Sequence, residues 1–159
     1  MRGALVLLAT LALALAGCDG GSDATTAGAP GSPAFEQANA SIETANGTVD
    51  LDVEIAETEA QRDFGLMQRK SLADDAGMAF LFPEDVSATF WMKDTLIPLS
   101  VAFADADGTI LEILDMEPCN ADPCPTYDPG VQYRTALEVN KGAFERLGVA
   151  RGDTLTIER

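Results

Sequence analysis

The segment from Phe90 to Thr95 holds the densest cluster of side chains that could bind a ligand, including the only tryptophan of the chain. Neighbouring side chains of an extended strand point to opposite faces, so Trp91 cannot share a face with both of its neighbours. The core is the expected place for Phe90 and Met92. Trp91, Lys93, Asp94 and Thr95 could hold a sugar ring or another small polar ligand by stacking and hydrogen bonding. The alternative is a tryptophan in the core whose neighbours satisfy buried backbone groups.

Glu138 is an acid within the apolar run Ala136-Leu137-Glu138-Val139. Either it lies on a solvent-exposed face, or it is buried beside a partner such as Arg62 or Arg69. A buried carboxyl group is a candidate acid or base. Together with Asp94, Glu138 could form the carboxylate pair of a glycoside hydrolase. The other interpretation is a structural ion pair or a surface acid.

Arg62 and Arg69 are seven residues apart in a predicted helix, so they share one helix face. Two cations on one face could bind an anionic ligand. They could equally pair with acids of the same domain, and both interpretations stay open.

The chain contains no histidine. This excludes His-dependent triads, His general bases and His metal ligands. No glycine-rich phosphate loop is present, and Asp105-Ala106-Asp107-Gly108 lacks the other ligands of a calcium loop, so it predicts a hairpin turn. We expect neither a metal nor a cofactor.

Cys119 and Cys124 are spaced C-x4-C in a Pro-rich segment. In an oxidising compartment an even pair of this kind favours a local disulfide. A zinc site would need two more ligands, and a redox motif would favour C-x2-C beside the start of a helix.

The N-terminus has the proportions of a bacterial lipoprotein signal. An apolar stretch from Ala4 to Ala16 follows Arg2 and ends at Gly17-Cys18. It is too short for a membrane-spanning helix, which needs about 20 residues, and it fits a secretory leader. We predict that residues 1–17 are removed and that Cys18 is lipidated, which places the protein at the cell membrane, facing the extracytoplasmic side. An uncleaved anchor and an ordinary signal peptide are the alternatives.

The rest of the chain divides in two. Residues 18–46 are rich in Gly, Ser, Ala, Thr and Pro without hydrophobic periodicity, which is typical of a flexible tether. Residues 47–159 are long enough for one domain with a single core. The formal net charge of −16 repels phosphate backbones, so nucleic acid is not an expected partner.

The patterns within residues 47–159 predict short strands and two short helices in mixed order. Apolar and acidic residues alternate over 48–55, which indicates a half-exposed strand. A capping box at Thr58 and Gln61 predicts a helix to about Arg69, and a second helix is expected over 141–147. Further strands are predicted at 77–82, 88–92, 99–104, 109–115, 132–139 and 154–158. The expected fold is α+β: a compact β-rich single domain with a mainly antiparallel curled sheet or small barrel.

Several ordered motifs resemble the domain-of-unknown-function 192 family over about residues 48–158. They are Arg62-x-x-Gly65-Leu66-Met67-x-Arg69, Gly77-Met78-x-Phe80-x-Phe82, Phe90-Trp91-Met92-Lys93-Asp94-Thr95-x-x-Pro98-Leu99, Asp107-Gly108, Leu137-Glu138-Val139-Asn140-x-Gly142 and Gly152-Asp153. The resemblance implies an exported protein, often a lipoprotein, with a β-rich α+β fold, but it implies no activity. One position departs from the family pattern, because Ser100 stands where Asp often follows the Pro-Leu pair.

Three functional hypotheses follow. The first is a non-catalytic, membrane-tethered envelope domain that binds a small molecule or a glycan through Trp91 to Thr95. The second is a hydrolase that acts on envelope glycans with Asp94 and Glu138. The third is an accessory module that binds another envelope protein through an exposed apolar patch.

Overall fold

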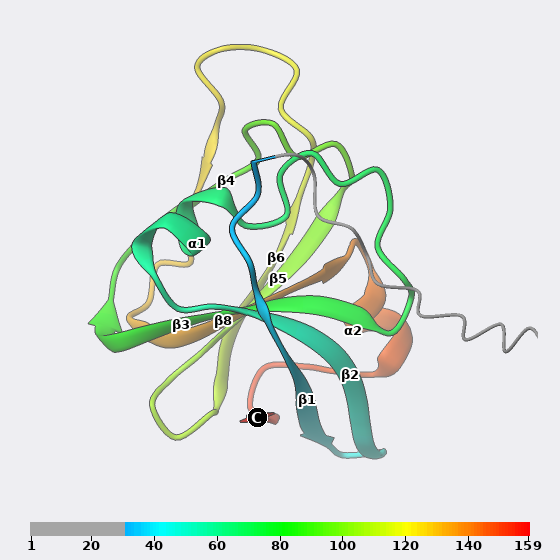
Figure 1. Ribbon diagram of the computed structural model, residues 1–159. Helices are drawn as coiled ribbons and strands as arrows, with labels where there is room; N and C mark the ends of the chain where they lie inside the picture. Colours follow the sequence, from blue (N-terminus) through cyan, green and yellow to red (C-terminus); the bar gives the residue numbers. More distant parts are fainter. Residues whose placement is uncertain (1–30) are drawn as a thin grey trace, which may run out of the picture.

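The computed structural model describes residues 31–159, and the predicted leader and Cys18 lie outside these residues. A seven-stranded sheet forms the body, with strand order β6-β5-β8-β3-β2-β1-β9 (Figure 1). A two-stranded sheet of β4 and β7 stands beside it. The strands are β1 (Glu36–Thr44), β2 (Gly47–Ala56), β3 (Ala76–Val86), β4 (Phe90–Trp91), β5 (Leu99–Ala104), β6 (Ile110–Met116), β7 (Thr126–Tyr127), β8 (Tyr133–Asn140) and β9 (Thr154–Glu158).

The large sheet is mainly antiparallel and strongly curled, as the sequence predicts. Only the β2–β3 pair is parallel. The two outer strands approach each other at one end, where Thr109 forms an isolated bridge to Thr154. This single bridge does not close the sheet into a barrel.

The predicted tether is wrong for residues 36–44, which form β1. This strand pairs with β2 along its whole length and with β9 on its other side. Ala40 and Ile42 are fully buried within it. Small residues such as Ala38 and Ala40 gave the segment a tether-like composition, although they alternate with polar residues as a half-buried strand requires.

The described part of the chain contains two short helices, α1 (Glu59–Phe64) and α2 (Ala143–Leu147). The predicted capping box begins α1: the Thr58 hydroxyl accepts from Gln61 N, and the Gln61 side chain accepts from Thr58 N. The helix ends at Gly65 (φ 49°), earlier than predicted. An added Cβ at Gly65 would lie 3.2 Å from the Phe80 ring, so glycine allows α1 to approach β3 closely.

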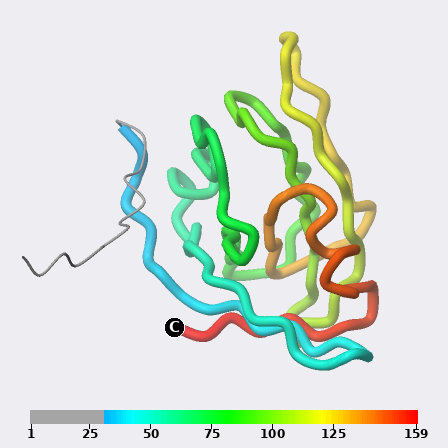
Figure 2. Tube along the Cα trace, turned by 90° about the vertical axis from the view of Figure 1, so that its right-hand side faces the viewer, coloured from blue at the N-terminus to red at the C-terminus, as the bar shows by residue number. Residues whose placement is uncertain are grey.

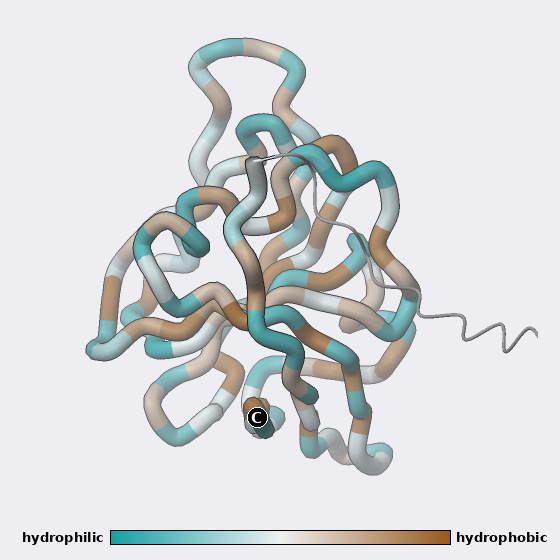
Figure 3. Tube along the Cα trace, viewed as in Figure 1, coloured by the Kyte–Doolittle hydropathy of each residue, from teal (hydrophilic) through white to brown (hydrophobic). Residues whose placement is uncertain are grey.

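Successive side chains of a strand point to opposite faces of the sheet, so the core is divided into two clusters, one on each face. In β8, Leu137 and Val139 belong to the cluster that α2 covers. Ala136 belongs to the other cluster, which includes Phe80, Phe103 and Tyr133. Hydrophobic residues follow the crossing central strands, and hydrophilic residues prevail in the surrounding loops (Figure 3). Glu138 therefore enters the second, aromatic cluster.

No helix within residues 31–159 is long and apolar enough to cross a membrane.

Candidate functional site

A cavity of about 310 Å³ opens beside the aromatic cluster. Helix α1 and the turn after it form one wall, and β4, the segment before it and Thr126 of β7 form the other. Its polar lining residues are Arg62, Asp63, Thr89, Thr95, Thr126 and Glu138. Its main apolar lining residues are Phe64, Leu66, Phe80, Phe82, Phe90 and Trp91.

Glu138 lines this cavity from the middle of β8. Its neighbours across the sheet are Met78 of β3 and Val101 of β5, both fully buried. Glu138 is only 4% exposed, and burial raises the pKa of its carboxyl group to about 8. Within residues 31–159 its side chain has neither a hydrogen bond nor an ion pair to protein. Every fully buried side-chain oxygen or nitrogen within residues 31–159 has a hydrogen-bond partner. Because the Glu138 carboxyl oxygens have none, they are not fully buried and are accessible from the cavity.

Arg62 lines the cavity from α1. Its Nη1 donates to the carbonyl oxygens of Glu57 and Leu81, and its guanidinium lies 4.9 Å from the centre of the Phe82 ring. Arg62 therefore does not pair with Glu138, although the sequence suggested that pair. The carboxylate next to it in the cavity lining is the exposed Asp63.

Trp91 stands at the cavity rim with 48% of its surface exposed, while its neighbour Met92 is fully buried. Trp91 and Met92 therefore point to opposite faces of the strand, as the sequence predicts. Thr126 of β7 pairs with Trp91 across the small sheet. The Lys93 ammonium lies 5.5 Å from the indole centre, and Lys93 itself does not line the cavity.

Asp94 and Arg69 do not line the cavity either. Asp94 adopts a positive φ of 54°, and its carbonyl accepts from Gln68 N at 2.8 Å. Its motif position therefore reflects a tight turn, which Asp tolerates better than most residues. Arg69 forms an ion pair with Glu54, which agrees with the ion-pair interpretation of the sequence. Arg69 and Glu54 line a separate hollow of about 360 Å³.

Ser100, the residue that departs from the family pattern, lies on the opposite sheet face from Glu138. Its hydroxyl donates to Asp115 at 2.6 Å and accepts from Gly142 N at 2.9 Å. Because α2 has no side-chain cap of its own at Gly142, Ser100 fixes the start of that helix and takes no part in the cavity.

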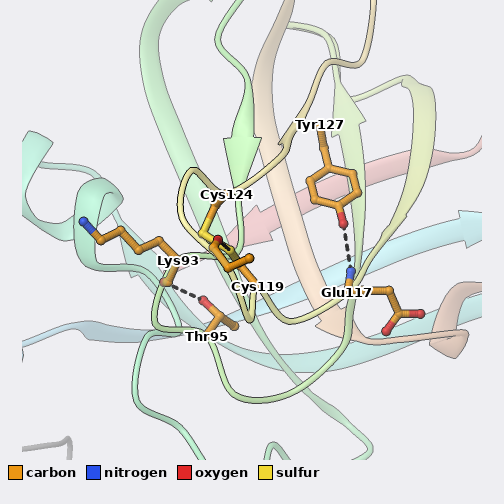
Figure 4. Close-up of a disulfide and its surroundings, with 7 residues drawn as sticks. Lys93, Thr95, Glu117, Cys119, Cys124 and Tyr127 are labelled. Atoms are coloured by element: carbon orange, nitrogen blue, oxygen red, sulfur yellow. Dashed lines mark hydrogen bonds between the residues drawn. A yellow bond between two sulfur atoms is a disulfide. The ribbon is translucent and has the colours of Figure 1, made fainter.

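The predicted disulfide joins Cys119 and Cys124 in the loop between β6 and β7. This loop rises away from the rest of the domain (Figure 2). The Tyr127 hydroxyl accepts from Glu117 N at 3.0 Å, and the disulfide lies between Tyr127 and the Lys93–Thr95 turn (Figure 4). The bridge thus constrains the loop that delivers Thr126 to the cavity.

The sequence alone did not reveal Asp63, Thr89 or Thr126 as cavity residues. Asp63 follows Arg62 in the motif, which was an available signal. Thr126 reaches the cavity only because β7 pairs with β4, and no local pattern predicts a pair of two-residue strands. No group of three or more potential metal ligands occurs in the part of the chain that the structure describes.

Comparison with known proteins places the chain in a family. The family DUF192, described as "Uncharacterized ACR", matches residues 41–157. The chain belongs to the DUF192 family. The match spans most of the folded domain and includes all the cavity residues named above, so the cavity is built from the region that defines a DUF192 domain.

Two crystal structures are similar to this DUF192 domain. One is a candidate transcription regulator from Sinorhizobium meliloti 1021, with 37% identity, a TM-score of 0.74 and coverage of 80% of this chain and 98% of that chain. The other is a protein of unknown function from Novosphingobium aromaticivorans DSM 12444, with 30% identity, a TM-score of 0.68 and coverage of 78% and 93%. No curated protein matches the chain.

Proposed function

We propose that this DUF192 protein is a non-catalytic, ligand-binding domain of the cell envelope, held at the membrane by lipid on Cys18. Its ligand is a small polar compound, with a saccharide as the first class to test. The observation that carries the proposal is a carboxyl group, that of Glu138, buried without a protein partner in the lining of a cavity. A buried polar group without a hydrogen bond costs free energy, and a ligand in the cavity would supply the missing partner.

The lining supports binding better than hydrolysis. Trp91 offers a half-exposed aromatic face at the rim, and three threonine hydroxyls and Arg62 surround the space. The hydrolase hypothesis named Asp94 as the second carboxylate, and Asp94 is not part of the cavity wall. Sites for small molecules commonly combine aromatic walls with a few convergent polar groups in this way.

The regulator description of the Sinorhizobium protein does not alter the proposal. A domain in a chain with a net charge of −16 is repelled by a phosphate backbone. We therefore propose no nucleic-acid partner.

The binding proposal is tested by the melting temperature of the purified protein with a panel of envelope saccharides and small anions. A compound that binds only the native state must raise the melting temperature. We expect at least one compound to do so, and expect Trp91→Ala to weaken its binding about fivefold, since aromatic contacts contribute about 1 kcal/mol.

Leu96→Ala is the matched control, because Leu96 is 51% exposed but does not line the cavity. It should bind the compound as well as the parent. If no compound raises the melting temperature, the ligand-binding proposal is wrong, and the apolar residues Trp91 and Leu96 would instead favour a protein partner.

The location is tested by Cys18→Ala. Stable membrane anchoring needs more than one acyl chain, and a lipidated N-terminal cysteine provides it. We expect the variant to carry no acyl chain and to remain as the larger, unprocessed precursor in the producing bacterium. An unchanged membrane fraction with normal processing would contradict lipidation at this residue.

A further inference from the structure

Aromatic side chains form much of the cavity lining, and hydrogen bonding to a ligand does not explain their presence. Phe80, Phe90 and Trp91 all line it, and the Phe80 and Phe90 rings meet edge to face with centroids 5.2 Å apart. Aromatic faces attract cations electrostatically, and the attraction grows when the cation is desolvated. The Lys93 ammonium, 5.5 Å from the indole centre of Trp91, already uses this attraction from outside the cavity.

The charged groups of the cavity also favour a cationic ligand. Among residues 31–159, the cavity lining holds the carboxyl groups of Glu138 and Asp63 and one basic residue, Arg62. Arg62 is already held by two backbone carbonyls and by the Phe82 ring, whereas Glu138 has no partner within residues 31–159. A net charge of −16 attracts cations from solution.

A neutral ligand would not require an acid at this place. Glutamine has the same shape and could donate and accept hydrogen bonds without the cost of ionisation. A carboxyl group between Met78 and Val101 can, unlike the amide, become an anion opposite a cation.

We infer that the ligand of this cavity carries an ammonium group, which pairs with the Glu138 carboxylate and lies against the rings of Phe80, Phe90 and Trp91. This inference rests on the proposed function and narrows its ligand class to amino sugars and other small ammonium compounds.

The test compares ammonium compounds with neutral counterparts of the same shape, using the purified full chain. Choline is paired with 3,3-dimethylbutan-1-ol, and glucosamine with glucose and N-acetylglucosamine. We expect choline or glucosamine to raise the melting temperature and the matching neutral compound to have at most a tenth of its affinity. Glu138→Gln should lower affinity for the ammonium compound at least tenfold, and Glu145→Gln, which removes an exposed acid on the other sheet face, should not.

A second measurement separates charge pairing from a merely structural effect of Glu138. The nitrogen of choline carries no proton, so any proton released on binding comes from the protein. Because burial raises the pKa of the Glu138 carboxyl group to about 8, choline should bind with release of a proton at pH 7 and more tightly at pH 9 than at pH 6. Titration calorimetry in phosphate and in Tris buffer gives the number of protons.

Few other charged groups face Glu138. Arg62 and Asp63 are the charged residues in the cavity lining. The elements β3 and β5 present Met78 and Val101, and β4 and β7 present Phe90, Trp91 and Thr126. Proton release that persists in Glu138→Gln would therefore contradict the inference.

The outcomes for the two proposals can be told apart. If glucose or N-acetylglucosamine binds as well as glucosamine, and Trp91→Ala weakens this binding, the ligand-binding function stands and the ammonium inference is wrong. If neither the ammonium compounds nor any saccharide or anion of the panel binds, both are wrong.

Discussion

Replacing Glu138 with glutamine is expected to make the protein more stable at alkaline pH, by about 3 to 5 kcal/mol at pH 8.5. At pH 5 the two proteins should differ by less than about 1 kcal/mol, because neutral glutamic acid and glutamine have the same shape and similar hydrogen-bonding capacity. A single substitution that removes an acid would thus stabilise an already acidic protein under the conditions where acids are ionised.

The sign follows from the pKa of Glu138, which burial raises from the usual 4.5 to about 8. Below pH 4.5 the group holds its proton in both the folded and the unfolded chain, so it does not affect the free energy of unfolding. Between pH 4.5 and 8 only the folded protein holds the proton, so stability falls as pH rises. Above pH 8 the full penalty is present, and glutamine avoids all of it.

Urea denaturation of the parent and Glu138→Gln between pH 5 and 9 measures this difference directly. Using the difference between the two proteins cancels the contributions of the other acids. Glu145→Gln is the control, since its exposed carboxylate in α2 should leave the pH profile nearly parallel to that of the parent. Parallel profiles for Glu138→Gln would show that the Glu138 carboxyl group ionises normally and is solvated.

Most of the fold could be predicted because its strands carry local patterns. Alternation in 48–55 reflects a strand with one buried face, and the hairpin of β5 and β6 follows from apolar runs around Asp105-Ala106-Asp107-Gly108. The capping box marked the start of α1. Its end was less visible, because a helix of six residues depends on the tight contact of Gly65 with Phe80, and tertiary contacts leave no periodic signal.

Some residues of the cavity could be named from the sequence, but not its geometry. Trp91 and Thr95, Arg62, and Glu138 come from three separate segments. The register of β8 between β3 and β5 decides that Glu138 lies on the aromatic face. A shift of one residue would turn Glu138 to the other face. Asp94 was a reasonable candidate from sequence, yet its left-handed backbone conformation explains it without a ligand.

Phe103→Ala is expected to lower the free energy of unfolding by about 3 to 5 kcal/mol. Phe103 is fully buried in β5, and its ring contacts those of Tyr133 and Phe90, with centroid distances of 4.8 and 5.4 Å. Truncation removes both edge contacts and leaves a cavity that a sheet strand cannot collapse to fill. Phe103→Leu retains most of the volume and should cost about 1 kcal/mol. Urea denaturation of both variants gives the two values.

The same substitution should also weaken the binding site, although Phe103 does not line the cavity. Its two ring partners support the cavity wall: Phe90 lines it directly, and the Tyr133 hydroxyl donates to the carbonyl of Ala88, another lining residue, at 3.0 Å. We therefore expect Phe103→Ala to weaken ligand binding even at temperatures where the variant remains folded, and Phe103→Leu to restore it. If Phe103→Ala is destabilised as expected but binds as tightly as the parent, the wall formed by Phe90 and Ala88 does not depend on the aromatic cluster beneath it.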